Sequence, residues 1–168
     1  MALEDALKRV ATRKDDLAQV VDAIVEEAAK LVSSPISYLA LMNKAGDVLT
    51  MIGWSQTVMA SCKMIDKPIV YPLEKTGLWG DCVRERQPVV TNDYPSLKKP
   101  TKKGYPQGHV NVKRHLNVCI MDGAHIAGVI GVGNKQQPYD NVDVKLLQEF
   151  ANRCYPLMPR QEVEAIVS

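Results

Sequence analysis

The sequence predicts an α+β fold in which helices pack chiefly on one side of an antiparallel sheet. Two strand-like segments, residues 114–121 and 124–133, are joined by Asp122-Gly123, a dipeptide that accepts the positive φ angles of a two-residue hairpin turn. After Asp140, which can cap a helix, apolar side chains recur at helical spacing. Further short strand-like segments precede this unit, so one antiparallel sheet with helices at its ends accounts for the pattern.

The first 32 residues carry an apolar stripe with a seven-residue repeat. The polar stretch 12–16 interrupts it and holds two aspartates that can cap a helix, so one long helix and two helices meeting near Arg13 both fit. The stripe can pair with a partner helix or pack on the sheet of its own chain. It consists of Leu3, Leu7, Val10, Leu17, Val21, Ile24, Ala28 and Leu31.

The middle of the chain alternates short strands with turns. Residues 76–86 predict a short helix capped by Thr76. Residues 92–113 hold three prolines and two glycines without periodicity, which indicates a long loop of the kind that often carries function. The strands are expected at residues 36–42, 47–53, 68–71 and 88–91.

Composition excludes several classes of protein. A chain of 168 residues with 46% apolar residues most simply forms one folded domain. Its 21 basic and 19 acidic residues give a net charge of +2, which favours no nucleic-acid partner. There is no apolar run of about 18 residues and no export signal at the start, so we expect no membrane partner and a cytoplasmic location. Four widely spaced cysteines form no Cys-x-x-Cys pair and indicate reduced thiols.

The order of these elements resembles a GAF domain over residues 16–158. Residues 69–72, 104–110 and 113–115 more narrowly resemble the GAF variant found beside bacterial sensor kinases and HD-type phosphohydrolases. On this resemblance, residues 1–15 are an N-terminal helical extension, and residues 159–168 are a tail that could begin a linker to an output domain. The motifs that carry the resemblance are residues 74–80 (EKTGLWG), 88–94 (PVVTNDY) and 128–135 (GVIGVGNK).

The resemblance implies a sensory, non-enzymatic function in signal transduction, as in two-component systems. It implies a GAF/PAS-like sheet of five to six strands, with the terminal helices on one side and a short helix plus the long loop on the other. A small molecule would bind in a pocket, and the terminal helices of a homodimer would relay binding to a histidine kinase or an HD-type phosphohydrolase. Neither the ligand nor a cofactor is identified by the sequence, and no metal site is predicted.

The predicted ligand pocket lies between the sheet and the short helix. Strand alternation places His115, Asn117 and Cys119 on one face, while the free N–H groups expected at a helix start near Gly77 suit an anionic or carbonyl-bearing ligand. A solvated strand face remains the alternative for His115 and Asn117, and core packing the alternative for Trp79. The resemblance implies a lining of Tyr71, Thr76, Gly77, Trp79, Thr91, Asp93, Tyr94, His115, Asn117 and Cys119.

Particular residues also bear on three other functions. A structural dimerisation module with a vestigial pocket fits the same pattern, and a haem or redox sensor could use His109, His115 or Cys119. Free methionine sulfoxide reduction is disfavoured, because Trp79 stands where that GAF lineage has a cysteine. Tyr94, Tyr105 and His109 could belong to a lid formed by the long loop, and a mobile surface loop explains them equally well.

A signature of cyclic-nucleotide GAF domains is only partly present. Asn134, Lys135, Tyr139 and Asp143 follow its order, but tyrosine replaces phenylalanine and Val144 replaces glutamate. We therefore expect any ion pair between Lys135 and Asp143 to be structural.

Overall fold

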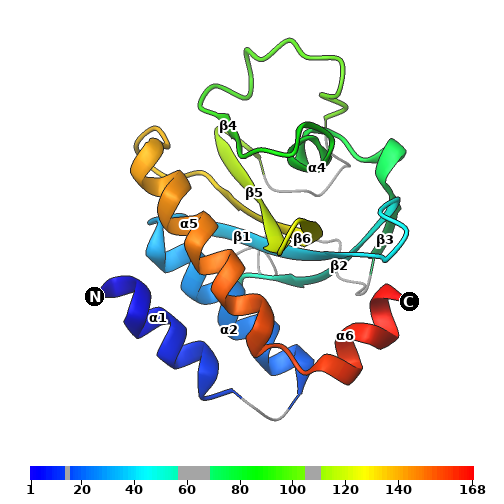
Figure 1. The fold of residues 1–168 in the computed structure, drawn as a ribbon. Coiled ribbons are helices and arrows are strands. Elements are labelled where there is room, and N and C mark those ends of the chain that lie inside the picture. The colour runs from blue at the N-terminus through cyan, green and yellow to red at the C-terminus, as the bar shows by residue number, and fades with distance from the viewer. Residues whose placement is uncertain (14–15, 57–68, 105–110) are drawn as a thin grey trace.

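The computed structural model describes residues 1–13, 16–56, 69–104 and 111–168. Within them lies a sheet of six strands in the order β3-β2-β1-β6-β5-β4, with every neighbouring pair antiparallel (Figure 1). The α+β fold class predicted from the sequence is therefore confirmed. The strands are β1 (Ile36–Met42), β2 (Val48–Trp54), β3 (Ile69–Pro72), β4 (Val89–Thr91), β5 (His115–Asp122) and β6 (His125–Gly133).

Four helices cover one face of the sheet, and a short helix with residues 92–104 of the long loop lies on the other (Figure 1). The covering helices are α1 (Ala2–Ala11), α2 (Leu17–Leu31), α5 (Asn141–Cys154) and α6 (Arg160–Val167). The opposite face carries α4 (Asp81–Glu85), preceded by the 3-10 turns η1 (Leu73–Lys75) and η2 (Leu78–Gly80), while the turn η3 (Tyr155–Leu157) follows α5. None of the helices in the described ranges is both long and apolar enough to cross a membrane.

The two faces of the sheet have different cores because strand side chains alternate. In β5, Leu116, Val118 and Ile120 pack in the aliphatic core under the helices, whereas Cys119 belongs to a smaller cluster on the other face. Gly123 has a φ of +63° in the turn between β5 and β6, as the Asp-Gly dipeptide predicts.

The start of α5 is fixed by reciprocal hydrogen bonds. The Asp140 side chain accepts from the backbone N–H of Asp143, and the Asp143 side chain accepts from that of Asp140, so the two residues form a capping box. Lys135, just after β6, donates to both Asp143 oxygens at 2.7 and 2.9 Å. This ion pair holds the end of β6 against the start of α5, which is the structural role expected for it.

The N-terminal stripe belongs to the core of its own chain. The segment forms two helices, and Asp16 caps the second by accepting from the N–H of Gln19 at 2.7 Å. Arg9 on α1 pairs with Glu27 on α2 at 2.9 Å. Six stripe residues are buried in the core, and the other two, Leu3 and Leu31, pack against it. The stripe itself is therefore occupied within the chain.

The last residues of the chain also join this core. Residues 159–168, expected to be a tail, form α6 after Pro159, and its side chains Val163 and Val167 are buried. The backbone N–H of Lys44 donates to the carbonyl of Val167 at 3.0 Å. Both ends of the described chain thus pack on the layer that covers the helical face of the sheet.

Candidate functional site

Aromatic and polar side chains form a row across the sheet face that carries α4. The rings of Tyr71 and Trp79 meet edge to face with centroids 5.2 Å apart, and Tyr38 meets Trp79 in the same way at 5.9 Å. At the other end, the Tyr94 ring lies 6.0 Å from that of His115. We call this set the polar row; its members are Tyr71, Trp79, Tyr38, Asn117, His115 and Tyr94.

Register places Tyr38 and Asn117 over a glycine. Tyr38 on β1 and Asn117 on β5 both pair with Gly131 on the strand between them, and the Tyr38 hydroxyl donates to Asn117 Oδ1 at 2.7 Å. A Cβ atom on Gly131 would overlap the Tyr38 ring and stand 2.5 Å from Asn117 Oδ1. The glycine is therefore needed for the phenol to reach across one strand.

Gly131→Ala is expected to lower the free energy of unfolding by about 1–3 kcal/mol, because the new methyl group overpacks a site closed by the Tyr38 ring. Gly133→Ala is the matched control on the same strand, where a Cβ atom would meet its nearest neighbour at 3.4 Å, an ordinary contact. Urea denaturation of both variants measures the difference. Equal midpoints for the two variants would contradict this account of the row.

His115 is a neutral, partly buried imidazole. Burial lowers the pKa of His115 to about 4, so the ring is uncharged near neutral pH. Its Nδ1 atom lies 3.2 Å from Asn117 Nδ2. Its Nε2 atom is buried and has no hydrogen-bond partner among the described residues. An unpaired buried donor or acceptor is costly, which makes this nitrogen a notable feature of the row.

Two buried thiols lie beside the row. Cys82 on α4 and Cys119 on β5 belong to the same apolar cluster. Interaction with Cys119, together with burial, raises the pKa of the Cys82 thiol, so it stays protonated. Across the described ranges, no three His, Cys, Asp or Glu side chains gather as metal ligands would.

A buried carboxylate joins α4 to the long loop. Asp81, with a side chain only 3% exposed, accepts from Arg84 Nη2 at 2.9 Å, from Lys99 Nζ at 2.8 Å and from Thr101 Oγ1 at 2.7 Å. Lys99 and Thr101 come from the loop after β4. These four residues, which we call the Asp81 cluster, tie residues 99–101 of that loop to α4.

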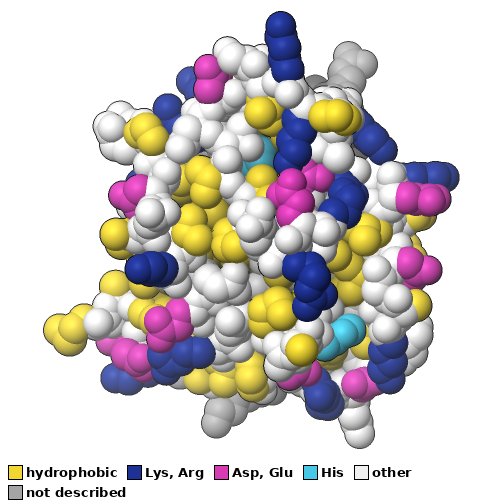
Figure 2. Space-filling view, turned by 45° about the horizontal axis from the view of Figure 1, so that its top comes forward, with side chains coloured by type: hydrophobic (Ala, Val, Ile, Leu, Met, Phe, Trp, Pro, Cys, Tyr) yellow, Lys and Arg dark blue, Asp and Glu magenta, His cyan; other side chains and the backbone are white. Residues whose placement is uncertain are grey.

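Charge on this side of the molecule is largely compensated. Lys102 donates to the carbonyls of Tyr94, Pro95 and Leu97, and its Nζ atom lies 4.5 Å from the centre of the Tyr94 ring. Figure 2, in which the top of Figure 1 has come forward, shows basic side chains interleaved with acidic ones. The lysine-rich segment is therefore partly fixed by internal contacts instead of forming a free basic patch.

The helix start predicted at Thr76 is wrong. The helix α4 begins at Asp81, while Thr76 is extended and its hydroxyl donates to the carbonyl of Leu73 at 2.6 Å. Arg84 reaches back and donates to that same carbonyl and to the carbonyl of Gly77 at 2.7 Å. This segment is thus held through its carbonyl groups, and Thr76 does not cap the helical turn η2, which begins at Leu78.

The structure separates the predicted site residues into groups. Thr91 is buried on β4 and pairs with His115 in the sheet, next to the row. Asp93 is exposed and accepts from the N–H of Ser96 in a turn, so it lies outside the row. The row contains five predicted residues, and Cys119 adjoins it. Tyr105 and His109 lie outside the described residues.

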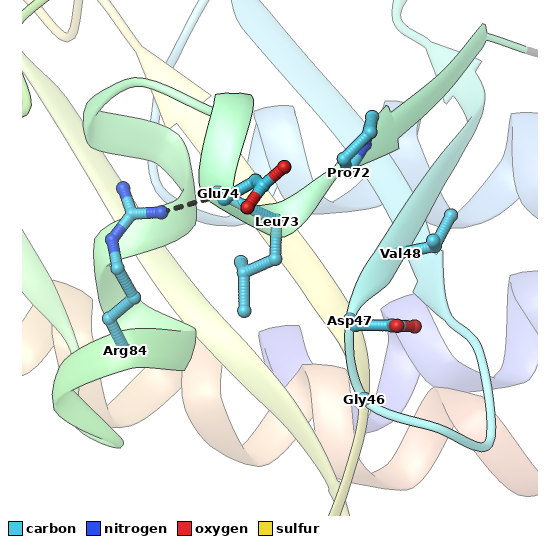
Figure 3. A pocket seen from close by; sticks show the side chains of 7 residues that line it. All are labelled: Gly46, Asp47, Val48, Pro72, Leu73, Glu74 and Arg84. Atoms are coloured by element: carbon cyan, nitrogen blue, oxygen red, sulfur yellow. Dashed lines mark hydrogen bonds between the residues drawn. The ribbon is translucent and has the colours of Figure 1, made fainter.

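Sequence reasoning missed Tyr38, Asp81 and Arg84. Alternation along residues 36–42 would put Tyr38 on the face opposite Leu39, which is the signal that could have found it. A separate hollow lies at the edge of the sheet, between the turn that carries Asp47 and the segment after β3 whose Leu73 carbonyl is bonded by Arg84 (Figure 3). It is lined by Gly46, Asp47, Val48, Pro72, Leu73, Glu74 and Arg84 and does not include the polar row.

Comparison with known proteins places this architecture in a family. The sequence model of the GAF domain family matches residues 14–154 of this chain. The chain belongs to the GAF domain family. The fold agrees with that of the GAF domain of an Acinetobacter phosphoenolpyruvate-protein phosphotransferase, with a TM-score of 0.70 and 16% identity over 98% of this chain and 96% of that one.

One curated protein and two further solved structures are also similar to this GAF domain. The methyl sulfide methyltransferase-associated sensor of Methanosarcina acetivorans is 43% identical over 88% of this chain, which spans only 15% of that relative. Free methionine-R-sulfoxide reductase from Neisseria meningitidis shares the fold, with a TM-score of 0.68 and 14% identity over 99% of this chain and 90% of that one. A GAF domain/HD domain protein from Geobacter sulfurreducens gives a TM-score of 0.69 at 12% identity, covering 92% of this chain and 99% of that one.

Proposed function

We propose that this GAF domain is the small-molecule-binding sensory module of a signal-transduction protein, with its ligand site at the polar row. The observation that carries the proposal is the burial of two polar groups on one sheet face. Asn117 is 2% exposed, and the Nε2 atom of His115 is buried. Packing of this face requires only apolar side chains. Buried polar groups of this kind are costly for a purely structural face. The likeness to a protein named as a sensor supports the same function.

The second part of the proposal is relay through the terminal helices to an output module, such as a histidine kinase or an HD-type phosphohydrolase. The helices α1, α2, α5 and α6 form the layer behind the sheet, so a displacement of the sheet reaches them directly. Because the apolar stripe of α1 and α2 is buried in its own core, a homodimer through these helices would use their outward residues, which include Gln19, Asp22 and Lys30.

Native mass spectrometry of the purified chain tests ligand binding. The expected result is a bound species whose mass exceeds that of the polypeptide and which disappears on denaturation. The fraction of protein that carries this bound species should be smaller in Tyr38→Phe, a variant of the polar row. The exposed Val142→Ala variant serves as the control. A native mass equal to the polypeptide mass would favour the alternative of a structural dimerisation module, which sedimentation velocity would then detect as a dimer.

Absorbance tests the other alternative, a haem or redox sensor that uses Cys119 or His115. The specific observation behind it is the unpaired Nε2 atom of His115. Adding haem to the purified chain should give a shifted Soret band if this nitrogen binds iron. An unchanged spectrum of free haem would remove this reading.

A further inference from the structure

The polar row contains a directed chain of hydrogen bonds that ends at His115. The Tyr38 hydroxyl donates to Asn117 Oδ1, so the amide group of Asn117 presents its Nδ2 atom to His115. An amide nitrogen can only donate hydrogen bonds, so Nδ1 of the imidazole must accept this one. In a neutral ring the proton then sits on Nε2. Three residues on two strands thus fix the tautomer of a buried histidine.

The opposite orientation of the amide is disfavoured by Tyr38. If Oδ1 faced His115, the phenol would have to accept from Nδ2, and its own proton would need another acceptor. No other hydrogen bond of the Tyr38 hydroxyl is found within the described ranges. Burial also raises the pKa of Tyr38 well above its usual value, so the phenol keeps that proton.

The charges that act on His115 cancel locally. They come from Asp81 and Lys99, which pair with each other at 2.8 Å. Tyr94 is the aromatic neighbour of His115. The ammonium group of Lys102 lies near Tyr94 and donates to three backbone carbonyls. The Asp81–Lys99 pair thus adds no net charge beside the neutral imidazole, and its Nε2–H group offers a hydrogen bond without a charge of its own.

We propose that His115 anchors the ligand of this domain by donating its Nε2–H to an uncharged carbonyl oxygen, as in an amide, lactam or ketone. The inference rests on the proposed function and narrows the ligand class to molecules with such an acceptor beside a planar group that fits the aromatic row. A carboxylate or phosphate would bring an uncompensated charge to a buried neutral donor, so both bind more weakly. This replaces the anion-binding helix start expected from the sequence.

The first test is the tautomer of His115, measured from its imidazole nitrogen shifts by nitrogen-15 NMR. The Nε2–H form is expected, without protonation of the ring down to about pH 5. In Asn117→Leu the ring is expected to populate both tautomers. An Nδ1–H ring in the unmodified chain, or protonation near pH 6, would overturn the inference.

The second test uses matched fragments, nicotinamide against nicotinate and benzamide against benzoate. The amides should shift the His115 nitrogen resonances and bind about tenfold more tightly than the acids, and His115→Phe should abolish the difference. The folded state of that variant is checked by its unfolding midpoint. Carboxylates that bind as tightly as amides, or amides that leave His115 unshifted, would overturn the inference even where native mass spectrometry finds a ligand. The absence of any bound mass counts against the proposed function instead.

Discussion

Replacing Phe150 by alanine is expected to lower the free energy of unfolding by about 3–5 kcal/mol. Phe150 lies on α5, has no exposed surface and is the largest of the fully buried side chains between the helices and the sheet. Its removal leaves a cavity that neighbouring residues of a close-packed core fill only in part. Urea denaturation followed by tryptophan fluorescence measures the loss.

Val142→Ala is the matched control for this change, because Val142 lies on the same helix and is 70% exposed. It should alter stability by no more than about 0.5 kcal/mol. A Phe150→Ala midpoint within error of the control would mean that α5 does not close the core.

Replacing Asp81 by alanine is expected to cost about 3 kcal/mol, because it leaves Arg84, Lys99 and Thr101 without their shared acceptor. The value lies at the lower end for a buried ion pair, since the Arg84 and Lys99 side chains are 28% and 31% exposed and regain some hydration. Thermal unfolding measures the cost. Glu85→Gln is the control, since Glu85 contacts Lys99 from the surface and should contribute about 0–1 kcal/mol.

The Asp81 contribution should also depend on pH. Burial raises the pKa of Asp81, but hydrogen bonds from Lys99, Thr101 and Arg84 outweigh burial and hold it below its usual range. A carboxyl group with a depressed pKa in the folded state stabilises the protein above its unfolded pKa of about 3.9, and this stabilisation is lost as the pH falls toward the folded pKa. The difference between the parent chain and Asp81→Ala should therefore shrink below about pH 4. A constant difference from neutral pH down to about pH 3 would contradict this assignment.

Local signals predicted most of the fold. The Asp122-Gly123 turn and the Asp140 cap depend on residues within a few positions of one another, so the last hairpin and α5 could be read directly from the sequence. The alternation of β5 predicted correctly which side chains face the helices, because a strand has a period of two residues.

The centre of the site could not be predicted in the same way. The contact between Tyr38 and Asn117 depends on the register of three strands and on a glycine between them, and these residues lie 79 positions apart in the chain. The bonds from Lys99 and Thr101 to Asp81 likewise depend on how a loop folds back over α4. Such pairings follow from tertiary packing, which no short window of sequence contains.

The error at Thr76 has a specific physical cause. A Thr-Gly pair before an apolar segment is typical of a helix cap, and the sequence offers no sign that a distant side chain will compete. Arg84 supplies that competition by binding the carbonyls of Leu73 and Gly77, and the α-helix then begins only at Asp81, after the 3-10 turn η2.

The alternation of side chains in β1 has a mechanical consequence. Tyr38 belongs to the polar row, while the next residue, Leu39, is fully buried among the helices, and an irregularity in the pairing with β2 follows between Leu39 and Ala40. One stretch of backbone thus carries both a side chain of the proposed ligand site and a side chain of the core beneath the helices. On the proposed function, a displacement of the Tyr38 ring would need to cross only one peptide unit to reach that core.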